Sequence, residues 1–216
     1  MNPAKLAPPA TGPTSGTVGA AAGAALRIAV VGDSTAAGSG VERHHEGFTG
    51  CLAHEVNLRT GRPVQWQVVG QFGATARRIR HRLLPQLGED LDVAVLLAGG
   101  NDVMNGRSPD QWREDLAAIV EDLAERAAHV LITGMPPFAH FPSLPPELSR
   151  AWSGRAATFD DVSRQICATH PVAMWVTMPG VPSSDFFASD RFHPSAAGYR
   201  RWAQVIAVHL APMICT

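Results

Sequence analysis

The sequence lacks the marks of several protein classes: it has few cysteines, no long hydrophobic run and almost no net charge. Its three cysteines are widely spaced, so they form neither a C-x-x-C metal motif nor a disulfide framework, and a reducing compartment is favoured. No stretch reaches the roughly 18 to 20 consecutive apolar residues of a transmembrane helix. A formal net charge of −1 argues against nucleic acid or an anionic membrane as a partner. These absences favour a cytoplasmic protein without a membrane span.

Residues 1–25 also lack the leucine-type apolar core of a secretory signal. The segment is rich in Ala, Gly, Pro, Thr and Ser, which supply too few large apolar side chains for a packed core. We therefore expect a disordered leader at 1–25 and a single domain at 26–216. A total of 216 residues, with 45% hydrophobic and 17% charged, suits that organisation. A secreted protein whose upstream signal was removed is the alternative.

Beyond residue 25, short apolar runs alternate with segments of helical periodicity. We expect strands at 26–31, 63–69, 92–98, 130–135 and 172–176, and helices at 46–60, 75–84, 109–127, 149–169 and 195–210. Ser108 and Pro109 fit the N-cap and the first position of the third helix. The alternation predicts an α/β fold in which helices cover both faces of a five-stranded, mostly parallel sheet. In such sheets ligands bind outside the carboxyl ends of the strands.

The first candidate catalytic motif is Gly32-Asp33-Ser34, which directly follows the first expected strand. Glycine permits a tight turn there, so the serine would lie at the carboxyl end of the strand as a nucleophile. Ser34 could instead only cap a following helix. A phosphate loop is disfavoured because neither G-x-x-x-x-G-K-[ST] nor G-x-G-x-x-G is present. The α/β-hydrolase elbow G-x-S-x-G is also missing, since Ala36 stands two residues after the serine.

A candidate general base lies in the sequence Asp190-x-x-His193-Pro194, just before the last expected helix. A spacing of three residues allows the Asp190 carboxylate to reach Nδ1 of His193, which leaves Nε2 free for a proton transfer. Pro194 biases the histidine toward an extended conformation and marks the entry to the helix. The alternative is an Asp–His pair on the surface at a helix start.

Candidate oxyanion donors follow two other expected strands. The sequence Gly-Gly-Asn-Asp at 99–102 could aim the side-chain amide of Asn101 at a developing oxyanion, beside the backbone N–H of Ser34. The same four residues are also typical of a simple turn. Gly73 could offer a further backbone N–H, and Gly70 is a rival for that role. Both glycines could equally be ordinary loop residues.

Taken together, these motifs resemble those of the SGNH, or GDSL, hydrolase superfamily from residue 26 to nearly the end of the chain. The resemblance implies a flavodoxin-like three-layer α/β/α fold and hydrolysis of carboxylic esters without a metal or a cofactor. It assigns the nucleophile to Ser34, the base to His193 and the orienting carboxylate to Asp190. It also assigns the oxyanion donors, which are Gly73, Asn101 and the backbone N–H of Ser34. Thr35 replaces the family's usual leucine. The asparagine often found shortly before the glycine is missing, which leaves Gly73 and Gly70 both open.

These residues predict a serine esterase that cleaves small or short-chain carboxylic esters through an acyl-enzyme on Ser34. Its partner would be a small-molecule ester bound in an open, shallow site, and a monomer is favoured although the oligomeric state stays open. An acyltransferase or a carbohydrate O-deacetylase would use the same residues, and a non-catalytic ligand-binding module would keep only the fold. Apolar side chains in and after the proline-rich stretch 136–146 are candidates for a lip beside the acyl site: Phe138, Phe141, Leu144, Leu148 and Trp152.

Overall fold

The computed structural model describes residues 6–20, 23–178, 180 and 182–214. Within these residues, six strands form one sheet in the order β1-β3-β2-β4-β5-β6. The strands are β1 (Ser15–Val18), β2 (Leu26–Gly32), β3 (Val64–Gly70), β4 (Leu91–Leu97), β5 (Ala127–Thr133) and β6 (Ala173–Val176). All neighbouring pairs are parallel except β1 with β3, which is antiparallel. The five parallel strands therefore have the flavodoxin-like order, and the expected α/β fold is confirmed.

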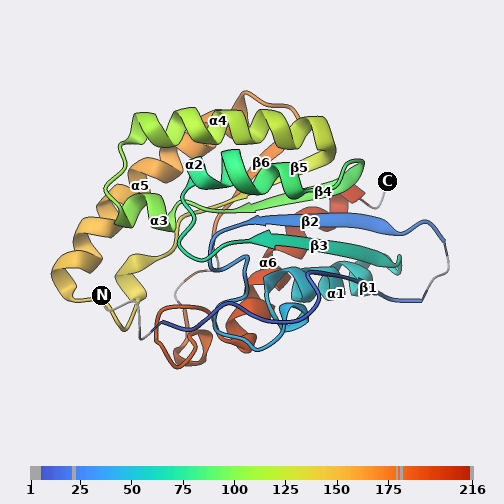
Figure 1. The fold of residues 1–216 in the computed structure, drawn as a ribbon, viewed down its shortest axis with the longest axis horizontal. Coiled ribbons are helices and arrows are strands. Elements are labelled where there is room, and N and C mark those ends of the chain that lie inside the picture. The colour runs from blue at the N-terminus through green and yellow to red at the C-terminus, as the bar shows by residue number, and fades with distance from the viewer. Residues whose placement is uncertain (1–5, 21–22, 179, 181, 215–216) are drawn as a thin grey trace.

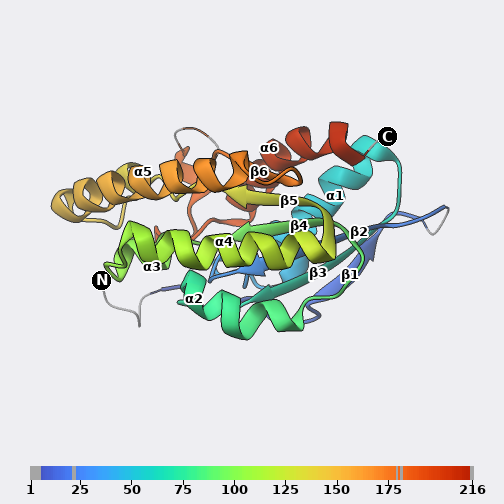
Figure 2. The same ribbon diagram turned by 90° about the horizontal axis from the view of Figure 1, so that it is seen from above.

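Helices cover both faces of this sheet, as Figures 1 and 2 show: α1 and α6 lie on one face, and α4 and α5 lie on the other. The helices are α1 (Phe48–Thr60), α2 (Ala76–Arg78), α3 (Gly100–Met104), α4 (Pro109–Arg126), α5 (Pro146–Ala168) and α6 (Ala196–Ile214). Shorter helical turns occupy His44–Glu46, Ile79–Leu83, Leu84–Gln86, Phe138–His140 and Ser184–Phe186. No helix in the described part of the chain is long and apolar enough to cross a membrane.

Strand β2 shows why the sheet is buried on both faces. Its side chains alternate between the two apolar layers, with Ile28 and Val30 packed toward α1 and α6 and with Ala29 and Val31 packed toward α4. All four side chains are fully or almost fully buried. A parallel strand covered on both sides needs an unbroken apolar run of this kind, which is what made it recognisable in the sequence.

Helix α4 begins as its sequence predicts. The Ser108 hydroxyl accepts a hydrogen bond from the Gln111 backbone N–H at 3.2 Å, and the Gln111 side chain accepts one from the Ser108 N–H at 3.0 Å. Pro109 occupies the first helical position, where a missing N–H costs nothing. This reciprocal cap fixes the start of a helix that buries Trp112 against α5.

The expected disordered leader is wrong for most of the segment that the structure describes. Residues 15–18 form β1, and the Val68 N–H donates a hydrogen bond to the Thr14 carbonyl at 2.8 Å. Backbone hydrogen bonds hold this segment, so its lack of large apolar side chains did not prevent it from ordering. The sheet consequently has six strands rather than five. Residues 1–5 and 21–22 of the expected leader lie outside the described residues.

Candidate active site

Strand β2 lies at the centre of the sheet, between β3 and β4, so the chain leaves it at the point where the strand order reverses. At that point the end of β2 approaches the end of β4 very closely. A Cβ on Gly32 would lie 2.1 Å from the Leu97 carbonyl oxygen, and the Asp33 N–H donates to that oxygen at 3.0 Å. Glycine is therefore needed at this position, and the contact holds the loop that carries Ser34 against the neighbouring strand.

Ser34 and the two residues of the Asp-x-x-His motif meet at this edge of the sheet. Ser34 Oγ lies 3.0 Å from Nε2 of His193, and Nδ1 of His193 lies 2.7 Å from Oδ2 of Asp190. The Ser34 and His193 residues are 8% and 2% exposed, so both sit inside the protein rather than on an open surface. A serine hydroxyl, an imidazole and a carboxylate connected in this order form the arrangement that activates a serine nucleophile.

The Asp190 carboxylate is held by four hydrogen bonds. Oδ1 accepts the backbone N–H groups of Phe192 and His193, and Oδ2 accepts the backbone N–H of Ala7 in addition to the imidazole. Burial on its own would raise the pKa of Asp190, but the hydrogen bonds from His193, Ala7 and Phe192 outweigh it and hold the pKa well below its usual range. The carboxylate is thus ionised at neutral pH and suited to orient the imidazole.

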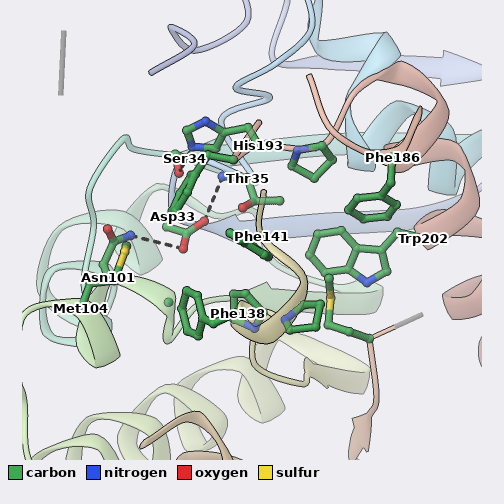
Figure 3. A pocket seen from close by; sticks show the side chains of 16 residues that line it. Asp33, Ser34, Thr35, Asn101, Met104, Phe138, Phe141, Phe186, His193 and Trp202 are labelled. Atoms are coloured by element: carbon green, nitrogen blue, oxygen red, sulfur yellow. Dashed lines mark hydrogen bonds between the residues drawn. The ribbon is translucent and has the colours of Figure 1, made fainter. Parts of the chain in front are cut away.

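Asn101 lies beside Asp33, in the first turn of α3 (Figure 3). Its Nδ2 donates hydrogen bonds to Oδ2 of Asp33 at 3.3 Å and to the carbonyl of Ala74 at 3.0 Å. Burial raises the pKa of Asp33, although the hydrogen bonds from Thr35 and Asn101 oppose that shift. The Gly-Gly-Asn-Asp motif forms the start of the short helix α3 rather than a simple turn.

The two candidate glycines occupy different surroundings. Gly73 has a φ of +73° with no heavy atom within 4 Å of a Cβ position, and its neighbour Phe72 lies 5.8 Å from His193, ring centroid to ring centroid. A Cβ on Gly70 would lie 2.3 Å from the backbone nitrogen of Ala37, so that glycine is needed for packing. The contacts of its neighbours place Gly73 beside the site.

An aromatic cavity of about 50 Å³ opens next to Ser34 (Figure 3). Phe138 and Phe141 line it, as the sequence suggested, whereas Trp152 packs behind Phe138 with the ring centroids 5.5 Å apart. Its other apolar side chains come from three separate parts of the chain: Met104, Pro136, Pro137, Met178, Phe186, Phe192, Pro194 and Trp202. These side chains make the cavity small and largely apolar.

Comparison with known proteins shows the family of this chain. Residues 30–201 match the GDSL-like lipase/acylhydrolase family. The chain belongs to this family. A GDSL-like esterase from Mycobacterium tuberculosis is 26% identical over 199 residues, which are 86% of this chain and 62% of the esterase. The chain therefore spans less than two thirds of the length of that curated relative.

Solved structures show the same fold. The crystal structure of TesA matches with a TM-score of 0.67 and 24% identity, over 87% of this chain and 99% of that one. AlinE4, an SGNH-hydrolase family esterase, matches with a TM-score of 0.60 and 24% identity, over 89% of this chain and 98% of that one. At these identities the likeness concerns the fold alone.

Asp102 follows Asn101 in α3 and is fully buried, although the sequence suggested only a turn at this position. Its Oδ2 accepts the backbone N–H of Ala76 at 2.9 Å, and its Oδ1 lies 3.0 Å from Nε of Arg107. Burial raises the pKa of Asp102 to about 6, against the hydrogen bond from Ala76 and the charge of Arg107. Asp102 thereby ties α3, which carries Asn101, to the loop after β3.

No group of three or more His, Cys, Asp or Glu side chains in the described residues is arranged to hold a metal ion.

Proposed function

We propose that this chain is a serine esterase that hydrolyses small or short-chain carboxylic esters, with Ser34 as the nucleophile. The observation that carries the proposal is the unbroken line of contacts from Ser34 Oγ through His193 to Asp190, at 3.0 and 2.7 Å. Membership in the GDSL-like lipase/acylhydrolase family supports it, and so does the esterase activity named for the mycobacterial relative.

The reaction begins with a proton transfer. With Nδ1 protonated and bound to Asp190, Nε2 of His193 accepts the Ser34 hydroxyl proton as Oγ attacks the ester carbonyl. Asp190 stabilises the resulting imidazolium without taking a proton itself. His193 then gives its proton to the leaving alcohol, which leaves an acyl group on Ser34. A water molecule then attacks the acyl group while His193 takes its proton, and His193 returns this proton to Ser34 Oγ as the carboxylic acid leaves.

The negative charge that develops on the carbonyl oxygen needs donors that are already in place. We assign this role to the backbone N–H groups of Ser34 and Gly73 and to Nδ2 of Asn101. In the free protein Asn101 uses that nitrogen to bind Asp33 and Ala74. The oxyanion would replace the longer bond, to Asp33, while the bond to Ala74 keeps the amide in position.

The cavity determines which acyl groups fit. A volume of about 50 Å³ lined by aromatic, proline and methionine side chains suits an acetyl or another short apolar group rather than a long chain. The same cavity would serve an acyltransferase or a carbohydrate O-deacetylase, since those reactions differ in the alcohol rather than in the acyl group. The cavity therefore selects the acyl group of the substrate and does not distinguish water from an alcohol as the acceptor.

A panel of nitrophenyl esters from acetate to palmitate tests the proposal. We expect hydrolysis to be fastest for the shortest esters and to be abolished in Ser34→Ala. Adding alcohols or sugars and analysing the products separates transfer from hydrolysis, because a transferase forms a new ester in place of the free acid. A Ser34→Ala variant with full activity, or a preference for palmitate, would overturn the proposal.

A further inference from the structure

The segment at residues 7–18, which we call the N-terminal strap, lies across the loop that carries Ser34. The Ala10 N–H donates to the Ala37 carbonyl at 2.9 Å, and the Thr11 N–H donates to the Glu42 carbonyl at 2.9 Å. At its far end the strap becomes β1, which pairs with β3. In Figure 1 it is the dark blue chain that runs from the left of the molecule to the edge of the sheet. Backbone hydrogen bonds thus fix the strap to the nucleophile loop.

The strap and the nucleophile loop also fit together without space between them. Ala10 is 8% exposed, and a Cβ built on Gly38 would lie 2.8 Å from the Ala10 methyl group. On the other side of the same loop, a Cβ on Gly40 would lie 2.2 Å from the Pro194 carbonyl oxygen. The strap, the Ser34 loop and the loop that ends in His193 are therefore packed at backbone distance, and each limits the position of the others.

At its start the strap reaches the catalytic carboxylate directly. The Ala7 N–H donates to Oδ2 of Asp190 at 2.9 Å, and this is the same oxygen that binds Nδ1 of His193 at 2.7 Å. The other oxygen, Oδ1, is bound by N–H groups of its own loop. Among the described residues, Ala7 is thus the one donor to this carboxylate from outside 190–193.

We infer that the Ala7 N–H is a positioning group for the proposed esterase reaction, on which the inference rests. It holds Oδ2 of Asp190 in the plane that aims Nε2 of His193 at Ser34. Without it, Oδ2 has only the imidazole as a partner, so the carboxylate and the ring can turn together. Because the strap is anchored on the Ser34 loop, Ala7 fixes the carboxylate relative to the nucleophile.

Two substitutions of Ala7 test this role, because only one of them removes the backbone N–H of residue 7. Ala7→Pro removes the N–H, whereas the matched control Ala7→Gly keeps it. For nitrophenyl acetate we expect Ala7→Pro to lower kcat about tenfold with KM within about twofold, because the orientation of the base matters mainly in the transition state. Ala7→Gly should keep the wild-type kcat. If the strap had only a structural role, Ala7→Pro would lower the melting temperature and leave kcat per folded enzyme unchanged.

A second pair of variants covers the case in which Ala7→Pro does not fold. Deletion of residues 1–8 removes Ala7 but keeps Ala10 and β1, and deletion of residues 1–5 keeps all three. Only the longer deletion should lower kcat. Equal kcat values for both members of each folded pair would overturn the inference.

A spectroscopic readout separates this inference from the proposed function. The downfield NMR signal of the His193 Nδ1 proton reports its bond to Asp190 and needs no turnover. It should move in Ala7→Pro and stay in place in Ala7→Gly. An inactive wild type, or an active Ser34→Ala, would refute the esterase proposal, and an unmoved Nδ1 signal in Ala7→Pro would still refute the role of Ala7.

Discussion

Asn101 and Asp33 follow different strands, β4 and β2, and the Asn101 side-chain amide donates a hydrogen bond to Oδ2 of Asp33 at 3.3 Å. The same nitrogen donates to the Ala74 carbonyl at 3.0 Å. Both N–H groups are therefore occupied in the free protein. A developing oxyanion has to take one of them, and the bond to Asp33 is the longer and weaker of the two.

This arrangement leads to a prediction for Asn101→Ala. If the amide stabilises the oxyanion, the substitution should lower kcat by roughly 10²- to 10³-fold, or about 3 to 4 kcal/mol, and should change KM little. Initial rates on nitrophenyl acetate measure both constants. Asn105→Ala is a suitable control, because Asn105 ends the same helix and is exposed. A folded Asn101→Ala enzyme that keeps more than about half of its kcat would rule out the oxyanion role.

His193 and Asp190 should differ in how far their substitution lowers kcat. His193→Ala removes the group that moves the proton, so kcat should fall almost to the background rate. Asp190→Ala leaves a histidine that can still act as a base but is poorly oriented, so it should keep roughly a hundredfold more activity. Burst and steady-state kinetics on nitrophenyl acetate compare the variants. Equal losses would indicate that Asp190 does more than orient the ring.

Stability should depend on pH through Asp190. Its folded pKa is held well below the reference value of 3.8, because hydrogen bonds from His193, Ala7 and Phe192 outweigh the effect of burial. A lowered carboxylate pKa stabilises the fold fully above the unfolded pKa, and this contribution is lost as the pH falls toward the folded pKa. We therefore expect Asp190→Asn to be less stable than the wild type at pH 7 and the difference to shrink below about pH 4.

Denaturant unfolding of both proteins at pH 7, 5 and 3 measures this difference. The values at pH 7 and 5 should agree, and the value at pH 3 should be smaller. A difference that is constant over all three pH values would show that the substitution acts through packing rather than through the charge of the carboxylate.

The aromatic cavity predicts a change of acyl preference in Phe141→Ala. Phe141 lines the cavity and contacts Phe192, with ring centroids 5.1 Å apart. Its removal should enlarge the cavity and raise kcat/KM for butyrate and hexanoate relative to acetate. Phe187 packs against the same ring at 5.2 Å but is not among the cavity residues, so Phe187→Ala is the matched control. Unchanged relative rates in Phe141→Ala would mean that the acyl group binds elsewhere.

Much of the fold could be predicted because it depends on local patterns. Strands β2 and β4 contain continuous apolar runs at 28–31 and 93–97, and helix α4 carries its start signal in Ser108 and Pro109. The proximity of Ser34 and Asn101 could be predicted from their positions after β2 and β4, because the carboxyl ends of parallel strands lie at one edge of the sheet. In each case a side-chain pattern carries the information, and the pattern lies within a few residues of the feature.

The rest depends on contacts between distant residues. β1 forms because its backbone pairs with β3, so its own composition gave little sign of a strand. The Ala7 N–H is a main-chain group that any residue but proline would supply, so no side chain marks it. Trp202 has the spacing of a buried residue on α6, and only the structure shows that it also lines the cavity.

Strand β1 covers an edge of β3 that could otherwise pair with another copy of the protein. It covers one side of β3, whose seven residues include the buried side chains of Val64, Trp66 and Val68. If β1 were absent, that strand would present a row of unpaired N–H and C=O groups, flanked by apolar side chains, and such an edge is a template for pairing between molecules. β1 itself has only four residues and leaves little edge to pair with. A chain trimmed to begin at Leu26 should therefore keep the catalytic motifs and aggregate.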